Sequence, residues 1–307
     1  MIDPYGREIT NLRISLTQDC NLRCFYCHRE GEDQAIENTS LELDEVKRLL
    51  ETASELGVYK VKYSGGEPLL HPEIENIVEY SSNLMDDVSL TTNGVLLGQK
   101  ANTLSEAGLD RVNVSLDADN QQTYKKITDE SKLYEVKRGI KRANEVGIYP
   151  VKINMLLMKG LNDDSIEEMI NLASETGSIL QIIEMTSNEE GKNRSFYQKY
   201  HISLKELATE LGKRAVRTET RNMHARKKYF LENPEVEVEL VRTMHNSKFC
   251  QNCTRLRVTS KAELKPCLLK TDNHVPVRKT IQNGGNIKDK FIEAIERREP
   301  YWGDGDG

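Results

Sequence analysis

The residues best suited to chemistry are six cysteines, which stand in two groups of three toward opposite ends of the chain. The first group is Cys20, Cys24 and Cys27, directly after a short apolar segment. Three thiolates at this spacing can hold three irons of a cubane [4Fe–4S] cluster and leave the fourth iron open to a small molecule. A zinc site completed by His28 is the alternative, because zinc also binds three cysteines and one histidine.

The second group, Cys250, Cys253 and Cys267, repeats this arrangement of three ligands. Zinc is again the alternative to a cluster, with His245 or His274 as its fourth ligand. No secretory signal opens the sequence, and no apolar run approaches the roughly 18 residues that cross a bilayer. We therefore expect a cytoplasmic protein, in which cysteines bind metal more often than they form structural disulfides.

Basic side chains share one face of several expected strands. Because side chains alternate across a strand, Arg13 lies opposite its apolar neighbours, Lys60 and Lys62 share a face, and Lys152 takes the polar face of its own segment. Lysines packed against helices would be costly, so these faces should point into an interior cavity. A single such lysine could extend from a strand end to solvent, but four cations at corresponding positions favour a pocket for an anion such as a triphosphate.

The elements that carry these residues follow a β-then-α rhythm. Amphipathic stretches lie between the strands; one is Leu41–Leu56, where Thr39 and Glu42 could form a capping box, and another is Asp163–Glu175. Six such units predict an α/β fold, a partial TIM-type (β/α)6 barrel whose site lies at the carboxyl ends of parallel strands. The expected strands are Leu12–Thr17, Val58–Ser64, Val88–Thr92, Arg111–Leu116, Val151–Leu157 and Ile179–Glu184.

The rhythm changes near residue 190, which predicts a barrel core over 1–190 and a C-terminal extension over 191–307 that closes the barrel and carries the second cysteine group. Val236–Val241 alternates like an antiparallel strand. Arg214–Lys228 is basic, which would suit a zinc-stabilised nucleic-acid-binding protein. Basic runs are usually solvated, however, and the net charge of −6 with a pI of about 5.7 argues against nonspecific nucleic-acid affinity.

The segment from Asp19 to Cys27 resembles the signature of the radical S-adenosylmethionine (SAM) superfamily. Gly65-Gly66-Glu67-Pro68 and the block around Ser115 resemble two further motifs of that superfamily. The resemblance implies a [4Fe–4S] cluster on the first cysteine group, whose open iron binds SAM and whose electron releases a 5′-deoxyadenosyl radical. It also implies that Tyr26, Gly66 and Ser115 contact SAM.

The segment from Cys250 to Arg257 resembles the C-terminal motif of the GTP 3′,8-cyclase family, also called molybdenum cofactor biosynthesis protein A, and similar blocks recur along nearly the whole chain. This resemblance implies a second [4Fe–4S] cluster that receives the guanine of GTP. It also implies catalytic roles for Arg13, Arg255 and Arg257. The implied GTP contacts are Arg13, Lys62, Thr91, Lys152, Arg255, Leu256 and Arg257.

The implied reaction is that of a lyase in the first step of molybdenum cofactor biosynthesis. Hydrogen is removed from C3′ of GTP, and the resulting carbon radical adds to C8, giving (8S)-3′,8-cyclo-7,8-dihydroguanosine 5′-triphosphate. The implied partners are GTP, SAM, an electron donor such as ferredoxin or flavodoxin, and a downstream cyclic pyranopterin monophosphate synthase. Neither a membrane nor a nucleic acid is expected as a partner, and a homodimer is compatible with the resemblance.

The chain departs from the family's pattern at three places. Lys62 and Gln181 stand where many bacterial members have arginine, and Gly305-Asp306-Gly307 replaces the usual Gly-Gly end. The replacement at Lys62 keeps the charge but loses a bidentate fork, whereas Gln181 removes a cation. The main rival enzyme is a radical SAM peptide maturase with an auxiliary cluster, although a peptide substrate leaves the cationic cavity unexplained.

Overall fold

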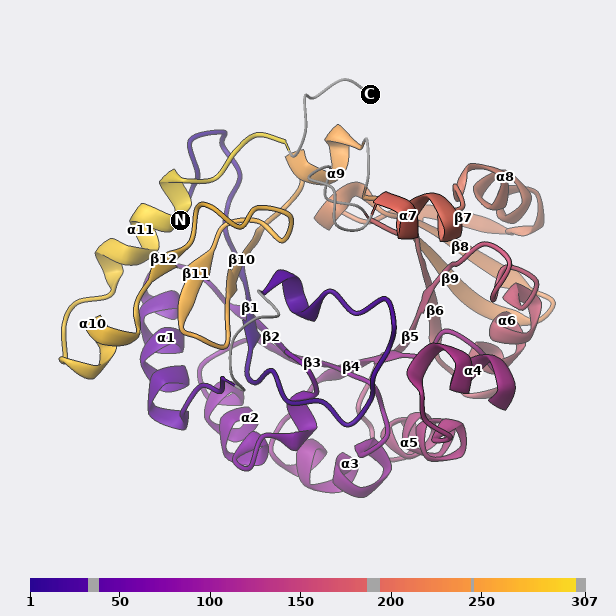
Figure 1. The fold of residues 1–307 in the computed structure, drawn as a ribbon, viewed down its shortest axis with the longest axis horizontal. Helices are drawn as coiled ribbons and strands as arrows, with labels where there is room; N and C mark the ends of the chain where they lie inside the picture. The colour runs from indigo at the N-terminus through magenta and orange to yellow at the C-terminus, as the bar shows by residue number, and fades with distance from the viewer. Residues whose placement is uncertain (33–38, 187–193, 244–245, 302–307) are drawn as a thin grey trace.

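The computed structural model of the chain describes residues 1–32, 39–186, 194–243 and 246–301. The barrel begins with six parallel strands that are neighbours in chain order, and helices pack around their outer side (Figure 1). These strands are β1 (Asn11–Ser15), β2 (Lys60–Ser64), β3 (Asp87–Thr92), β4 (Arg111–Ser115), β5 (Val151–Leu156) and β6 (Ile179–Ile183). All six expected strands are confirmed, with ends that differ by at most a few residues.

The helices of this core are α1 (Leu43–Glu55), α2 (Ile74–Ser82), α3 (Leu97–Glu106), α4 (Gln121–Thr128), α5 (Leu133–Glu145) and α6 (Ile166–Glu175). The expected cap of α1 at Thr39 is wrong. The helix begins at Leu43, so Glu42 is its N-cap, and the capping box joins Glu42 with Glu45. The backbone N–H of Glu42 donates to Glu45 Oε2 at 3.0 Å, while the Thr39 hydroxyl bonds that of Ser260.

The C-terminal extension adds strands to both edges of the barrel sheet. Strand β9 (Glu235–Val241) runs parallel to β6, and β10 (Arg255–Val258) runs parallel to β1. Strand β9 is antiparallel only to β8, so the expectation from its alternating pattern holds for one of its two neighbours. The resulting order is β12-β11-β10-β1-β2-β3-β4-β5-β6-β9-β8-β7. The added elements are α7 (Arg194–Tyr200), α8 (Lys205–Arg214), β7 (Arg217–Thr220), β8 (Lys227–Glu232), α9 (Ser247–Gln251), β11 (Glu263–Lys265), β12 (Val275–Pro276), α10 (Arg278–Gln282) and α11 (Lys288–Glu296).

The chain crosses from one sheet edge to the other through α9, which lies near the opening between the two edges (Figure 1). Cys250 lies on α9, Cys253 follows that helix, and Cys267 lies in the loop after β11. The extension therefore brings both cysteine groups to one barrel.

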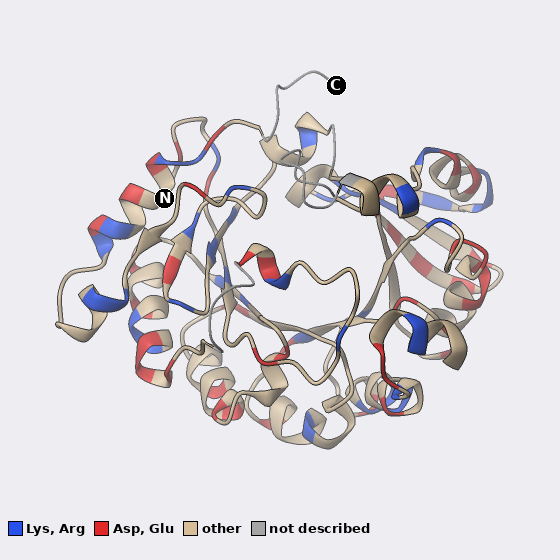
Figure 2. Ribbon diagram, in the orientation of Figure 1, with Lys and Arg blue, Asp and Glu red and all other residues tan. Residues whose placement is uncertain are grey.

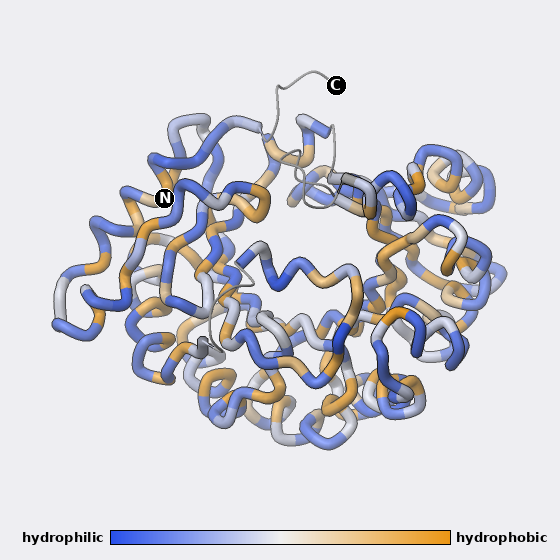
Figure 3. The backbone as a smooth tube through the Cα atoms, viewed as in Figure 1, coloured by the Kyte–Doolittle hydropathy of each residue, from blue (hydrophilic) through white to orange (hydrophobic). Residues whose placement is uncertain are grey.

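The core lies between the sheet and its helices. On β1, Leu12 and Ile14 are fully buried there, and Val61 and Tyr63 take the same side of β2. The alternate residues face the interior, so hydrophobic and hydrophilic segments alternate along the strands (Figure 3). Lysine and arginine accordingly occur on strands around the interior as well as on the outer helices (Figure 2). Among the described helices, none has both the length and the apolar character that crossing a bilayer requires.

Candidate active site

A cavity of about 1970 Å³ lies inside the barrel. The four cations expected on inward strand faces, Arg13, Lys60, Lys62 and Lys152, all line it, which confirms that prediction. Single ligand pockets usually measure about 300 to 1,000 Å³, so this cavity has room for two small molecules together.

Strand register places three cations, Arg13, Lys62 and Arg257, side by side on neighbouring strands. Arg13 lies opposite Lys62 on one neighbouring strand and opposite Arg257 on the other. Arg255 points inward from the same strand as Arg257, opposite Asn11. Burial is the main cause that lowers the pKa of both Lys62 and Arg255, and neighbouring cations lower each further. On this part of the cavity wall the positively charged side chains therefore outnumber the negatively charged ones, which suits an anionic ligand.

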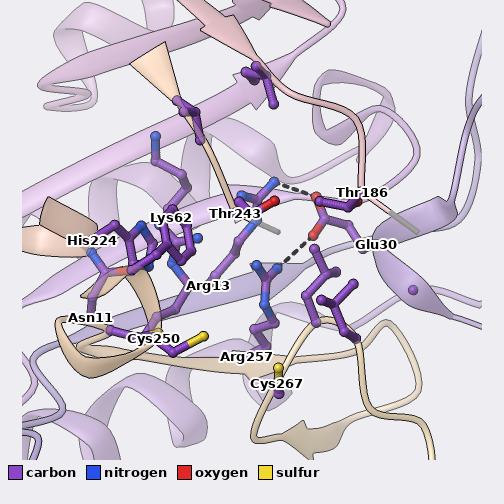
Figure 4. A pocket seen from close by; sticks show the side chains of 18 of the residues that line it. Asn11, Arg13, Glu30, Lys62, Thr186, His224, Thr243, Cys250, Arg257 and Cys267 are labelled. Carbon is purple, nitrogen blue, oxygen red and sulfur yellow. Dashed lines mark hydrogen bonds and ion pairs between the residues drawn. The ribbon is translucent and has the colours of Figure 1, made fainter. Parts of the chain in front are cut away.

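Glu30, which the sequence analysis did not single out, lies between two of these arginines (Figure 4). It lies on the short 3-10 helix η1 (Arg29–Gly31), after the first cysteine group. Its carboxylate pairs with Arg13 and, at 2.9 Å, with Arg257. Burial opposes ionisation of Glu30, but the two arginines outweigh it and lower its pKa to about 2. The position between Arg13 and Arg257 therefore accepts a negatively charged group.

A second buried carboxylate, Glu239, organises the opposite part of the wall. Its Oε2 accepts hydrogen bonds from Lys152 Nζ at 2.8 Å and from Gln181 Nε2 at 2.5 Å. Arg226 Nε lies 3.0 Å from Oε1, and Arg221 NH1 lies 3.7 Å from it. Burial raises the pKa of Glu239, but the charges of Arg226 and Lys152 and the hydrogen bonds from Lys152 and Gln181 bring it to about 2. Both arginines belong to the basic stretch predicted to be solvated, and for these two that prediction is wrong because they line the cavity.

The first cysteine group lies on the loop that leaves β1, at the carboxyl end of the parallel strands. Burial raises the pKa of Cys24, and so do the nearby Asp117 carboxylate and the thiols of Cys27 and Cys20. Cys20 Sγ accepts hydrogen bonds from Leu22 N at 3.5 Å and from Asn93 Nδ2 at 3.8 Å. Such N–H donors stabilise thiolate ligands of iron–sulfur clusters.

The second cysteine group faces the same cavity, which Cys250, Cys253 and Cys267 all line. Burial and the charge of Arg13 lower the pKa of Arg257, whereas Glu30, Cys267 and Cys253 act in the opposite direction. Figure 4 shows Cys250 and Cys267 close to that arginine. None of the six cysteines, all of which are described, forms a disulfide. Two sets of three thiols fit two clusters that each keep one open iron.

The histidines proposed for zinc have other environments. His28 lines the cavity, where desolvation by the surrounding protein lowers its pKa. His274 Nδ1 pairs with Glu263 Oε2 at 3.0 Å, and His245 lies outside the described residues. Within the described ranges, no three or more His, Cys, Asp or Glu side chains are arranged to hold a single metal ion. Each cysteine set offers three thiolates, the number of protein ligands that a [4Fe–4S] cluster with one open iron requires.

Of the three residues expected to contact SAM, Tyr26 and Ser115 line the cavity, whereas Gly66 is not among its lining residues. The Tyr26 hydroxyl donates to Asp117 Oδ2 at 2.6 Å, while Asp117 Oδ1 accepts from Leu156 N at 2.7 Å. Asp117, which the sequence analysis did not single out, therefore orients Tyr26. Gly66 packs against the cysteine loop: a Cβ there would come within 2.3 Å of the Asp19 carbonyl oxygen, which explains the glycine without reference to a ligand.

Thr91 and Leu256, two of the expected GTP contacts, have different environments. Thr91 lines the cavity. Leu256 is fully buried in the hydrophobic core, because it alternates with the inward-facing Arg255 and Arg257. The side chain of Leu256 therefore faces away from the cavity, and only its backbone is left to meet a substrate.

Comparisons with known proteins match this site. Residues 14–173 match the radical SAM superfamily, and residues 178–303 match the family described as Molybdenum Cofactor Synthesis C. Probable GTP 3′,8-cyclases from Pyrococcus horikoshii and Thermococcus kodakarensis are each 46% identical to the chain; both alignments cover 98% of it, and 98% and 99% of the respective relative. The probable GTP 3′,8-cyclase of Methanothermobacter thermautotrophicus is 44% identical, with 98% of each chain covered.

Solved structures agree on the fold. SuiB of Streptococcus suis, bound to its precursor peptide SuiA, superposes with a TM-score of 0.67 at 16% identity, over 97% of this chain and 67% of that one. The structure named anSMEcpe with bound AdoMet gives 0.62 at 19% identity, over 94% and 80%. At these identities the likeness concerns the fold alone, a radical SAM partial barrel. On the two matched families and the full-length relatives, the chain belongs to the GTP 3′,8-cyclase family of the radical SAM superfamily.

Proposed function

We propose that this chain is a radical SAM lyase that converts GTP to (8S)-3′,8-cyclo-7,8-dihydroguanosine 5′-triphosphate, the first step of molybdenum cofactor biosynthesis. The observation that carries the proposal is the convergence of two cysteine groups and a row of cations on one cavity of about 1970 Å³. The fold, the two ligand sets and the anion site each have a place in this reaction.

Cys20, Cys24 and Cys27 would hold the SAM-binding [4Fe–4S] cluster, and Cys250, Cys253 and Cys267 would hold the substrate-binding one. When bound, the first cluster and SAM together supply the 5′-deoxyadenosyl radical chemistry. Tyr26, Gly66 and Ser115 are the proposed SAM contacts, with Tyr26 oriented by Asp117.

The chain's own contribution to GTP is binding and orientation. Arg13, Lys62 and Arg257 are neighbours across three strands and would bind phosphate oxygens. Arg255 points inward next to the second cysteine group and would position the nucleoside. Fixing both ends of GTP holds C3′ and C8 in a near-attack geometry, which is the main advantage of an intramolecular cyclisation. Thr91, Lys152 and the Leu256 backbone complete the proposed contacts.

The test is turnover by the anaerobic, reconstituted and reduced protein with SAM and GTP deuterated at C3′. Because one hydrogen leaves C3′ and one is regained on reduction, unlabelled product has the mass of GTP and is identified by its different chromatographic retention. We expect that product and deuterium in 5′-deoxyadenosine. C24S should abolish both, and Arg217→Gln, an exposed change outside the cavity, should keep both. Deuterium-free 5′-deoxyadenosine and unchanged GTP would refute the substrate assignment.

The same preparation distinguishes the rival functions. About eight irons per chain are expected for two clusters, whereas about two zinc ions would indicate structural metal sites. Conversion of a ribosomal peptide library without conversion of GTP would indicate a peptide maturase. The proposed cellular context is the cytoplasm, with a ferredoxin- or flavodoxin-type electron donor and a cyclic pyranopterin monophosphate synthase as the next enzyme. The proposed domains remain 1–190 and 191–307.

A further inference from the structure

A cluster of charged residues on the β6–β9 side of the cavity contains two arginines, Arg221 and Arg226, that have no role so far. It centres on Glu239, which is fully buried on β9 and lies opposite Gln181 in the parallel register with β6. Lys152, Arg221 and Arg226 all lie within ion-pair distance of this carboxylate. Three cations around one anion leave a net positive charge, and all three side chains line the cavity.

The hairpin between β7 and β8 determines where the two arginines lie. Arg221 N donates to Arg226 O at 2.8 Å, which closes the turn that contains the 3-10 helix η3 (Met223–Ala225). Within that turn the His224 ring stacks on Phe249 with centroids 3.8 Å apart and planes 12° apart. His224 N also donates to Asn252 O at 3.0 Å. The turn is therefore attached to the segment that carries the second cysteine group.

The polar atoms of Arg226 are incompletely satisfied. Its side chain is only 11% exposed. Although its Nε lies 3.0 Å from Glu239 Oε1, both atoms are buried without an aligned hydrogen-bond partner among the described residues. Such atoms are costly unless a ligand or water meets them.

Arg221 and Arg226 line the same cavity as the arginines assigned to GTP, which are Arg13, Arg255 and Arg257. The charges of Arg221 and Arg226 also lower the pKa of Lys152, after burial. These cations therefore form a belt around one cavity, and a ligand that neutralises both parts must carry several negative charges.

We infer that Arg226 and Arg221 bind phosphate groups of the nucleotide substrate, and that Glu239 is a positioning residue that holds Lys152 and Arg226 toward them. This inference rests on the proposed function, because it takes the nucleotide to be the anion that fills the cavity. Arg13 and Arg257 contact the nucleotide from one side of the barrel, and the cations of β5 and of the β7–β8 turn contact its phosphates from the other.

The test compares nucleotide binding by anaerobic holoenzyme variants. Arg226→Gln and Arg221→Gln are measured by equilibrium dialysis with GTP, GDP and guanosine. Arg217→Gln is the matched control, because it removes a cation from the same hairpin that is 59% exposed and pairs with Glu219. A hydrogen bond to a charged group contributes enough that its loss weakens binding about tenfold to a hundredfold.

We expect R226Q to weaken GTP binding about tenfold or more. R221Q should weaken GTP binding less, because Arg221 is the more exposed of the two arginines. The affinity for guanosine should change by less than about twofold in both variants, since guanosine carries no phosphate for the arginines to bind. R217Q should match the wild type for every ligand. Arg226→Lys should recover part of the GTP affinity, because it restores the charge without the guanidinium fork.

Two results would overturn the inference and can be told apart. If the wild type binds and converts GTP, but R226Q and R221Q keep its preference for GTP over guanosine, the arginines do not bind phosphate and the proposed function stands. If the wild type shows no preference for GTP, the proposed function fails and this inference fails with it. The iron content of each variant identifies any variant that has not folded. If R226Q has not folded, the GTP and guanosine affinities of R226K and R221Q decide the outcome.

Discussion

Glu30 offers the sharpest quantitative test of the cavity's electrostatics. Its carboxylate is 13% exposed and pairs with Arg13 and Arg257, which lower its pKa from 4.5 to about 2. At 1.36 kcal/mol per pKa unit, a fall of about 2.5 units corresponds to about 3 kcal/mol of stability at neutral pH. Glu30→Gln keeps the shape of the side chain but removes the charge, so the variant should lose about that much.

The assay is urea unfolding of cluster-free protein under anaerobic, reducing conditions. Because the pKa of Glu30 is depressed by folding, its contribution is complete above pH 4.5 and disappears as the pH falls toward 2. The difference between the wild type and E30Q should therefore be equal at pH 8 and pH 6. At pH 4 it should be about 1 kcal/mol smaller.

The matched control is Glu219→Gln, which breaks an exposed pair with Arg217 and should cost less than about 1 kcal/mol. An E30Q variant as stable as E219Q at pH 7, or a difference that grows as the pH falls, would refute the ion-pair geometry described for Glu30. The same variant should bind GTP more tightly than the wild type, because a carboxylate that competes for Arg13 and Arg257 has been removed.

Three further predictions concern the cluster, substrate and SAM sites. Cys24→Ser and Cys250→Ser should each lower the iron content from about eight to about four per chain. Only C250S should keep SAM cleavage, and equal losses of SAM cleavage in the two variants would contradict separate cluster sites. Burial, the main cause, lowers the pKa of Lys152 to about 8, so its charge is present below that pH. GTP binding should weaken as the pH rises through 8 in the wild type but not in K152R, and identical profiles would argue against a Lys152 contact. Asp117→Asn should weaken SAM binding several-fold, because Tyr26 loses the carboxylate that accepts its hydroxyl at 2.6 Å, whereas unchanged SAM affinity in a dialysis assay would remove Asp117 from the SAM site.

The parts of the structure that local pattern controls could be predicted from the sequence. The six core strands are short alternating or apolar runs, and the same alternation indicated that Arg13, Lys60, Lys62 and Lys152 share an interior face. Parallel β-then-α units then determine which end of the barrel carries the first cysteine loop. These inferences need only residue order and side-chain direction.

The parts that depend on distant contacts could not be predicted in this way. Glu30 and Glu239 each lie near other acids in the sequence, and only the folded chain shows that each pairs with cations from remote segments. Arg221 and Arg226 belong to a run that composition assigns to solvent. The one available signal was that Glu239 occupies the polar face of an alternating strand, where an unpaired buried charge would be costly.

The pairing of β10 with β1 has a consequence for synthesis of the protein. The first strand to leave the ribosome keeps one open edge until nearly the whole polypeptide has been made, and β6 waits in the same way for β9. Open edges of this kind recruit other strands. A nascent chain that stalls before Arg255 is therefore a target for aggregation, and complete translation is a condition for a soluble barrel.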